Sequence, residues 1–265
     1  MKKRIDVIMT EKNLSPSREK AKLFINSGMV FVDGEKINKV SARFDEGCNI
    51  IVEKDKFKYV SRGGLKLEKA LKEFNIDLKN MVCLDCGAST GGFTDCMLQH
   101  GARKIYSVDV GHGQLYKKLV DNLSVVNLEG INVRNADASL FEEAIDFFTV
   151  DVSFISLKLI LPSIKNLVAP GTVGVCLVKP QFEVGKNNVG KHGVVRDKNL
   201  HSLVVNNILK FCVENEFSVL ALDYSPIKGP EGNIEYLLLI KRSKTTYIDK
   251  LVAVDSVVEN SHEKL

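Results

Sequence analysis

The sequence predicts an α/β domain with a mostly parallel sheet of seven strands, preceded by a small α+β domain. Strand and helix patterns alternate from Leu65 onwards, as expected for a parallel sheet covered on both faces. A glycine-rich loop follows the first of these strands. The positive charge is concentrated near the N-terminus: residues 1–80 contain 18 Lys and Arg against 12 Asp and Glu, and the remainder contains 19 against 21. This split indicates two parts with different partners.

The composition is that of an ordinary folded chain of 265 residues, 45% hydrophobic and 26% charged. Such a composition excludes an intrinsically disordered or fibrous protein. The most apolar stretch, 147–178, is interrupted by Asp151, Lys158 and Lys165, so no run is long enough for a membrane-spanning helix. The first ten residues lack the apolar core of a signal peptide. We therefore expect a cytoplasmic protein with no membrane partner.

Six cysteines are scattered along the chain without the spacing of a disulfide framework. The single CxxC, Cys83 to Cys86, lies in an apolar run, and no second Cys or His pair follows at zinc-site spacing. We expect these to be packed cysteines of a strand, and we expect no metal.

The N-terminal segment predicts two short helices followed by a small sheet. Ser15-Pro16-Ser17 is a helix start, and an apolar stripe at Ala21, Phe24 and Ile25 ends at Gly28. Residues 29–37 then predict a hairpin around Asp33-Gly34, and residues 49–52 predict a further strand.

This order of elements, with the pattern from Ser17-Arg18 to Asp33-Gly34, resembles the α-L RNA-binding module of a small-subunit ribosomal protein over residues 3–55. In that family the helix pair presents basic side chains to structured RNA. A basic patch on a small domain is also what a binder of phosphate backbones requires. The resemblance implies RNA contacts by Arg4, Arg18, Lys20 and Lys22, with Lys36, Lys39 and Arg43 as further candidates. We also expect the linker residue Arg62 to contact RNA.

Residues 53–64 are charged, nearly free of aliphatic side chains, and end in two glycines, so we place a linker there. The expected division is an RNA-binding domain with its linker over 1–60, a larger domain over 61–241, and a tail over 242–265. The tail is polar, and we expect a loose surface segment.

The larger domain begins with a helical pattern at 65–74. Expected strands follow at 81–85, 104–109, 123–127, 147–152, 172–178, 218–224 and 234–240. Expected helices lie near 92–100, 155–168 and 198–214.

The first strand of this domain runs into the loop Asp85-Cys-Gly-Ala-Ser-Thr-Gly-Gly-Phe93, which opens a helix. Glycines allow a backbone to approach a ligand closely, and a helix start offers unpaired N–H groups. The loop is neither a dinucleotide fingerprint nor a P-loop. Asp109 ends the next strand, where a carboxylate can accept both hydroxyls of a ribose.

The loop pattern D-x-G-x-x-x-G-G-F resembles that of S-adenosylmethionine-dependent methyltransferases of the heat-shock ribose-methylating type, with a Rossmann-like fold. The resemblance implies that Asp109 holds the cofactor ribose and that residues 129–134 are the candidate region for the adenine. It also implies that the loop holds the methionyl part, through Asp85, Gly87, Ser89, Gly91 and Gly92.

Two ionisable residues lie at the tips of expected strands: Asp151 after 147–150 and Lys179 after 173–178. The Asn/Asp-Pro-Pro-aromatic motif expected of enzymes that methylate base amines is absent. A ribose hydroxyl must lose its proton as it attacks a methyl group, and a lysine can assist. Together with Lys66 and Glu235, these residues resemble the Lys-Asp-Lys-Glu tetrad of 2′-O-ribose methyltransferases.

Over about residues 3–241 the chain resembles the TlyA hemolysin-like rRNA methyltransferases. This family implies 2′-O-methylation of cytidine in ribosomal RNA of ribosomal subunits, by a monomer or homodimer, with residues 183–196 (containing Lys186, Lys191, His192 and Arg196) as a cover over the substrate. An RNA-binding protein with an inactive methyltransferase fold and a membrane-lysing hemolysin are the alternatives. The matching segments are SRGGLKL (61–67), DCGASTGGFTD (85–95), DVSFISL (151–157), VKPQFE (178–183) and GPEGNIEY (229–236).

Overall fold

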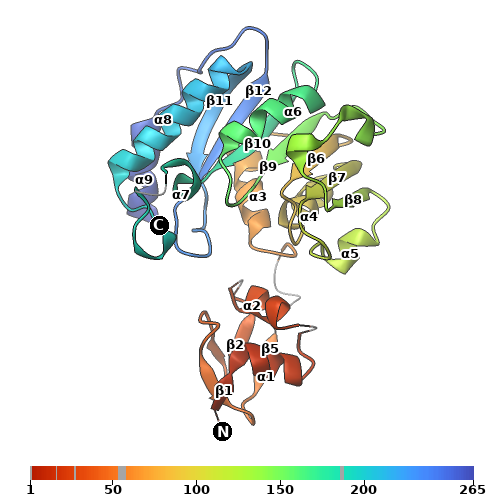
Figure 1. Ribbon diagram of the computed structural model, residues 1–265, viewed down its shortest axis with the longest axis vertical. Helices are drawn as coiled ribbons and strands as arrows, with labels where there is room; N and C mark the ends of the chain where they lie inside the picture. The colour runs from red at the N-terminus through yellow and green to blue at the C-terminus, as the bar shows by residue number, and fades with distance from the viewer. Residues whose placement is uncertain (1, 16, 27, 53–57, 186–187) are drawn as a thin grey trace. The chain divides into compact units, whose positions relative to one another are not determined.

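The computed structural model describes residues 2–15, 17–26, 28–52, 58–185 and 188–265. The chain divides into two compact units, Met1–Arg62 and Gly63–Leu265 (Figure 1). Each unit has its own buried core.

The first unit has two helices packed together beside small sheets. The two helices bury Ile5, Ile8 and Ile25. The turn Asp33-Gly34 has positive φ at both residues, which is the geometry of a tight hairpin turn. The expected helix-helix-hairpin order is confirmed. The elements are β1 (Lys2–Arg4), α1 (Ile5–Glu11), α2 (Arg18–Asn26), β2 (Val30–Val32), β3 (Glu35–Lys36), β4 (Arg43–Asp45) and β5 (Ile50–Val52).

Sheet pairing in this unit adds a feature that the sequence did not predict. Strand β2 pairs with β3 as the expected hairpin requires and also pairs with β5, whereas β1 and β4 form a separate two-stranded sheet. These two strands have three residues each and are rich in charge. Such short segments carry no hydrophobic alternation, so no sequence pattern marks them.

The second unit is built on one sheet of seven strands in the order β11-β12-β10-β9-β6-β7-β8. Strand β12 is antiparallel to both neighbours, and all other pairs are parallel, which confirms the mostly parallel seven-stranded sheet. The strands are β6 (Val82–Cys86), β7 (Lys104–Asp109), β8 (Val125–Glu129), β9 (Phe147–Val150), β10 (Val173–Val178), β11 (Phe217–Tyr224) and β12 (Tyr236–Arg242).

Helices cover both faces of this sheet, with α6 and α8 on one face and α3 and α4 on the other (Figure 1). The main core lies under α6 and α8, where Val150, Ile164 and Ile208 are buried. The helices are α3 (Gly63–Glu73), α4 (Gly92–Gln99), α5 (Lys117–Val120), α6 (Leu161–Leu167), α7 (Pro180–Glu183), α8 (Lys198–Glu214) and α9 (Val254–Lys264).

The expected helix over 155–168 is only partly correct. The structure has a 3₁₀ turn at Leu157–Leu159 and then α6, with Pro162 in its first turn. Proline fits the start of a helix but not its interior, so it divides the segment. The third strand is also shifted, to Val125–Glu129 from the expected 123–127.

The expectation of a loose C-terminal tail is wrong. Residues 254–264 form α9, which packs against α8 and β11. Val258 and Ser261 are almost fully buried there. The segment is polar apart from a narrow stripe of valines, and only the tertiary structure supplies the apolar surface that this stripe covers. Within the described residues, no helix has the length and apolar character needed to cross a bilayer.

The order of the strands determines where a ligand can bind. The chain runs from β6 outward through β7 to β8 and then returns to β9 on the other side of β6. The loops that follow β6 and β9 therefore leave the sheet in opposite directions. A crevice opens at such a switch point, at the carboxyl ends of the strands.

Candidate functional site

A cavity of about 480 Å³ lies at this switch point. That volume is in the usual range for small-molecule sites. Residues from the loops after β6, β7, β8 and β9 line it: Gly87, Ser89, Val108, Asp109, Val110, Gln114, Ile131, Asn132, Val133, Asp151, Val152, Ser153, Phe154, Ile155 and Ile160.

The loop after β6 depends on glycine at two positions. Gly87 has φ +86°, and a Cβ there would stand 2.4 Å from the backbone oxygen of Asp151. Gly91, with φ +93°, precedes the first residue of α4, Gly92, and a Cβ on Gly91 would collide with Leu119. Both positions need a residue without a side chain. Gly87 lets the loop lie directly against the end of β9, and Gly91 leaves room for Leu119 of α5.

Asp109 lies at the end of β7 and lines the cavity. Its two carboxylate oxygens accept N–H bonds from Ser89 and Gly111, each at 2.8 Å. An ionised carboxylate has about four lone-pair sites, so two remain for a ligand. Asp109 can therefore both fix the glycine loop and accept hydroxyl groups.

Gln114 lines the same cavity and was not predicted. Its position depends on Glu129, the last residue of β8, whose carboxylate accepts the backbone N–H groups of Gly113, Gln114 and Leu115. Burial would raise the pKa of Glu129, but these hydrogen bonds outweigh it and hold the pKa below its ordinary value. No motif marks this acceptor, because its donors are backbone groups 14–16 residues away.

Asp85 does not line the cavity. Its side chain is fully buried and accepts hydrogen bonds from Thr94 of α4 at 2.6 Å and from Thr149 of β9 at 3.0 Å. Burial raises the pKa of Asp85 to about 6, against the opposing effect of the two hydroxyl donors. The geometry gives Asp85 the role of joining β6, β9 and α4 beneath the loop.

The four tetrad candidates meet at one edge of the cavity, although they come from distant parts of the sequence. Lys179 Nζ is 2.6 Å from Asp151 Oδ1, and Lys66 Nζ is 3.8 Å from Asp151 Oδ2. Lys66 Nζ also donates to Glu235 Oε2 at 2.5 Å. The side chains are only 2–17% exposed.

Charge is balanced in this cluster, with two lysines and two carboxylates. Burial alone would raise the pKa of Asp151, but Lys66 and Lys179 outweigh burial and lower it. Breaking a buried pair leaves an uncompensated charge, which is strongly destabilising. Asp151 is also the member that lines the cavity, so it connects the charged cluster to the ligand site.

Two aromatic residues that were not predicted as site residues, Phe154 and Phe182, lie beside this edge. Phe154 is 91% exposed and has the left-handed φ of 64°, which is costly for a bulky residue. Its ring centroid is 5.2 Å from that of Phe182. An exposed, strained aromatic at a cavity mouth is a functional signal that only the structure displays.

The expected substrate cover, 183–196, is tethered to the loop that precedes β12. Asn233 donates to the Gly193 carbonyl and accepts the Val195 N–H. Glu183 accepts from Ser156 Oγ at 2.6 Å and so anchors the segment. Arg196 and His192 are exposed. Lys186 lies outside the described residues, and the role of this segment as a cover stays a prediction.

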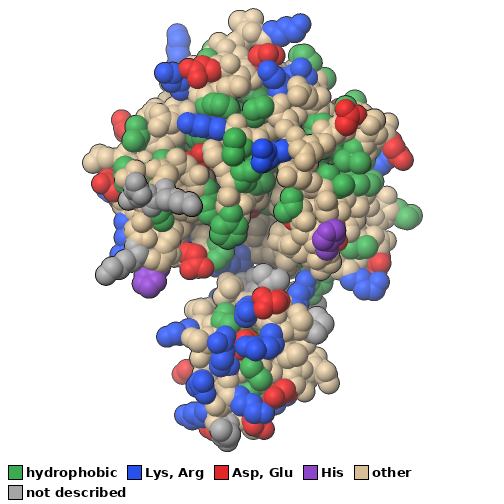
Figure 2. All heavy atoms as spheres, viewed as in Figure 1, with side chains coloured by type: hydrophobic (Ala, Val, Ile, Leu, Met, Phe, Trp, Pro, Cys, Tyr) green, Lys and Arg blue, Asp and Glu red, His purple; other side chains and the backbone are tan. Residues whose placement is uncertain are grey.

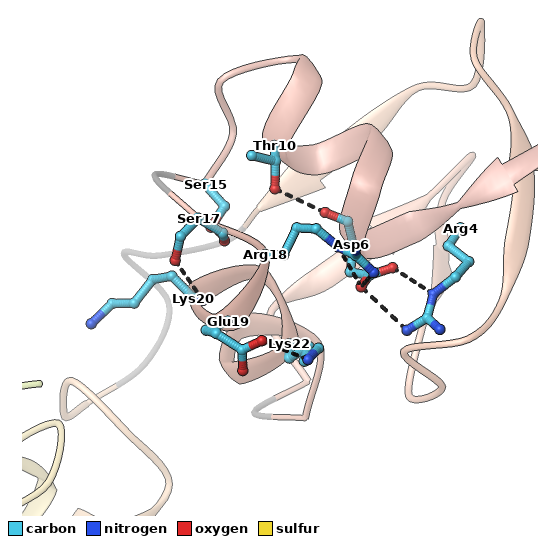
Figure 3. Close-up of polar contacts among 9 residues, drawn as sticks. All are labelled: Arg4, Asp6, Thr10, Ser15, Ser17, Arg18, Glu19, Lys20 and Lys22. Atoms are coloured by element: carbon cyan, nitrogen blue, oxygen red, sulfur yellow. Dashed lines mark hydrogen bonds and ion pairs between the residues drawn. The ribbon is translucent and has the colours of Figure 1, made fainter. Parts of the chain in front are cut away.

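The predicted RNA contacts of the first unit include an ion cluster (Figure 3). Asp6 accepts from Arg4 and from Arg18, each with a shortest distance of 2.9 Å. Lys22 pairs with Glu19 at 2.7 Å, and Ser17 accepts the backbone N–H of Lys20 at the start of α2.

Basic residues gather on the surface of this unit, as the face drawn in Figure 2 shows. The further candidates Lys36, Lys39 and Arg43 are exposed, and Arg62 is half-buried immediately before α3. Among the described residues, no group of three or more His, Cys, Asp or Glu could hold a metal ion.

Comparison with known families matches both units. The model of FtsJ-like methyltransferases matches residues 59–242, and the S4 domain model matches residues 3–49. A relative from Mycobacterium tuberculosis, the 16S/23S rRNA (cytidine-2′-O)-methyltransferase TlyA, is 35% identical over 99% of this chain and 97% of its own. The chain belongs to the TlyA family of FtsJ-like methyltransferases.

Other TlyA-like proteins agree with this assignment. Hemolysin A of Brachyspira hyodysenteriae is 43% identical over 88% of this chain and 98% of its own. A solved structure from Streptococcus thermophilus, provisionally named a hemolysin, superposes with a TM-score of 0.81 at 42% identity and covers 99% of this chain and 96% of that one. The S4 match confirms the resemblance found for the N-terminal segment, and S-adenosylmethionine is the methyl donor of this TlyA-family chain.

Replacing Asp109 tests its assignment to the ligand ribose. Asp109→Ala should weaken S-adenosylmethionine binding by about 1.5–3 kcal/mol, the range for hydrogen bonds to a charged group. Calorimetric titration measures this loss. Asp121→Ala, which removes an exposed carboxylate outside the cavity lining, should bind normally. An unchanged dissociation constant in folded Asp109→Ala would place the ribose elsewhere.

Asp85 should make stability depend on pH. Because its folded pKa of about 6 exceeds the ordinary 3.8, the folded form binds the proton more tightly than the unfolded chain. The free energy of unfolding should therefore decline as pH rises from about 4 to about 7. Asp85→Asn should remove this part of the slope in denaturant titrations across that range. Parallel pH curves for the two proteins would contradict the assignment.

Proposed function

We propose that this protein transfers a methyl group from S-adenosylmethionine to the 2′-hydroxyl of a cytidine ribose in ribosomal RNA, acting on ribosomal subunits in the cytoplasm. The observation that carries the proposal is the cluster of Lys66, Asp151, Lys179 and Glu235 at the edge of the cavity. The TlyA relative from M. tuberculosis, whose name states this reaction, supports it.

The residues that line the cavity have the hydrogen-bond acceptors and apolar side chains that the cofactor would require. Asp109 retains acceptor sites for the ribose hydroxyls, and Ile131 and Val133 offer apolar contacts to the adenine. The loop containing Gly87, Ser89, Gly91 and Gly92 would hold the methionyl part, with Asp85 supporting that loop from below. When bound, S-adenosylmethionine supplies a methyl group on a positively charged sulfur.

The tetrad would act on the attacking hydroxyl. Lys179 is held by Asp151 and also donates to Ser153 Oγ at 3.0 Å, so its amine has a defined position at the cavity edge. We assign to Lys179 the direct assistance: with its amine uncharged, it would accept the proton that the attacking hydroxyl loses. Glu235 holds Lys66, and Lys66 places a second positive charge beside Asp151. The intact geometry of this cluster favours an active enzyme over an RNA-binding protein with an inactive fold.

Nucleotide-resolution mapping of 2′-O-methylation on ribosomal subunits tests the function. Subunits incubated with the protein and S-adenosylmethionine should gain a methyl group on a cytidine ribose. Lys179→Ala should abolish this signal while cofactor binding persists. If the variant retains more than about a tenth of the wild-type rate, a barrier change below about 1.4 kcal/mol, then Lys179 is not the assisting residue. If wild-type protein yields no 2′-O-methylation, the proposed function is wrong.

The first unit would bind folded rRNA through phosphates, and the second would perform the chemistry. The concentration of positive charge in residues 1–80 and the S4 match support this division. Phosphate contacts carry little sequence information, so such a unit would position the protein on its substrate.

Charge reversal on α2 tests the division. The variant Lys20→Glu/Lys22→Glu should bind ribosomal subunits more weakly, and the slope of log affinity against log salt should decrease by about one unit for each phosphate that is no longer neutralised. Affinity for S-adenosylmethionine should not change. A matched reversal in the second unit, Lys117→Glu/Lys210→Glu, changes net charge equally at exposed positions and should have the smaller effect. Equal effects of the two reversals would show that only net charge matters.

A further inference from the structure

Asp6 differs from the other acidic residues that the structure describes in the first unit, because its side chain is fully buried and theirs are exposed. It is the second residue of α1 and lies between Arg4, at the end of β1, and Arg18, at the start of α2. Both arginines turn toward it (Figure 3). Two guanidinium groups from different elements therefore share one carboxylate.

Each of the two arginines donates two hydrogen bonds to the carboxylate of Asp6. Arg4 donates through Nε to Oδ1 at 2.9 Å and through Nη2 to Oδ2 at 3.2 Å. Arg18 donates to Oδ2 through Nε at 3.2 Å and through Nη2 at 2.9 Å. A guanidinium has five N–H donors in a rigid plane, so three on each arginine are not used by Asp6.

Burial and exposure differ sharply within this cluster. Asp6 has no exposed surface, whereas the side chains of Arg4 and Arg18 are 38% and 52% exposed. Burial by itself would raise the pKa of Asp6, but the hydrogen bonds from the two arginines outweigh it and lower the pKa. The carboxylate is thus ionised at neutral pH, and the cluster keeps a net positive charge on its exposed side.

We propose that Asp6 is a positioning residue that holds Arg4 and Arg18 as a preformed clamp for phosphate groups of the RNA backbone. This inference rests on the proposed RNA-binding function. Arginine side chains lose rotamer freedom when they bind, and fixing them beforehand removes that cost. The planar N–H forks suit the paired oxygens of a phosphodiester.

For removal of the Asp6 charge, the clamp and a simple net-charge effect predict opposite changes in RNA affinity. If only the total charge of the unit mattered, removing the negative charge of Asp6 would strengthen binding to RNA. If Asp6 positions the arginines, the same change releases them and weakens binding. Asp6→Asn keeps the size of the side chain and removes its charge, so it separates these two cases.

The experiment measures dissociation constants for ribosomal subunits over a range of salt concentrations. Asp6→Asn should raise the dissociation constant about fivefold or more at moderate salt. Glu19→Gln is the matched control, because Glu19 also pairs with a basic side chain, Lys22, but is 80% exposed. This control should bind as tightly as wild type or more tightly. Equal or tighter binding by Asp6→Asn would overturn the proposal.

A second variant covers the case in which Asp6→Asn unfolds the first unit, which circular dichroism and thermal melting would reveal. Arg4→Lys/Arg18→Lys keeps both charges but loses the planar forks, and it should weaken subunit binding at unchanged net charge. Wild-type affinity in this folded variant would refute the clamp. In folded variants the loss should also appear in the KM for subunits more than in kcat, as expected for altered substrate binding.

Failure of the clamp and failure of the proposed function give different results in these experiments. Wild-type protein that binds and methylates subunits, together with Asp6→Asn that does so with equal affinity, overturns the clamp alone. Wild-type protein that neither binds subunits nor methylates their RNA overturns the function, and the clamp with it.

Discussion

The close approach of the loop after β6 to the end of β9 is the constraint on which the rest of the catalytic unit depends. Gly87 lies so near the backbone of Asp151 that any side chain would separate them. Because β6 and β9 are parallel neighbours at the switch point, this contact brings the cavity loop and Asp151 to one place. The cavity and the charged cluster share a boundary for this reason.

Two carboxylates, that of the fully buried Asp6 and that of the mostly buried Asp151, are each held between two basic side chains. Asp151 is shared by Lys66 and Lys179, and Asp6 is shared by Arg4 and Arg18. Isolated, either carboxylate would carry a large desolvation penalty, and two cations offset it. Around Asp151 the cations are themselves buried, which suits chemistry sheltered from water. Around Asp6 they remain exposed, which suits contact with a large polyanion.

Polar contacts beneath the site fix its components more firmly than apolar packing alone could. Thr94 and Thr149 hold Asp85, and Thr94 Oγ1 is also 2.8 Å from Ser107 Oγ. This buried network joins three strands to α4. Fully paired buried polar groups specify a single arrangement, because any other leaves a partner unsatisfied. Another buried polar contact lies at α8. His201 of α8 contacts Tyr236 Oη of β12 and the carbonyl oxygen of Val195, and so connects α8 with β12 and with segment 183–196.

The sequence by itself determined the helix-helix-hairpin order of the first unit, the seven strands of the second unit, the two-part organisation and the types of residue at the site. These features are local patterns, and local patterns can be recognised directly in the sequence. They include glycine at 87 and 91, aspartate at strand tips, and the alternation of strands and helices. Tertiary structure alone decided that Asp85 faces the core rather than the cavity and that the polar tail is a packed helix. The family resemblance grouped Lys66 with Glu235, but only the fold, which brings them together across 169 residues, placed Lys66 Nζ 2.5 Å from Glu235 Oε2. The fold also decided that Asp6 joins two arginines. Each of these depends on which surfaces the fold brings together, and residue spacing along a chain does not contain that information.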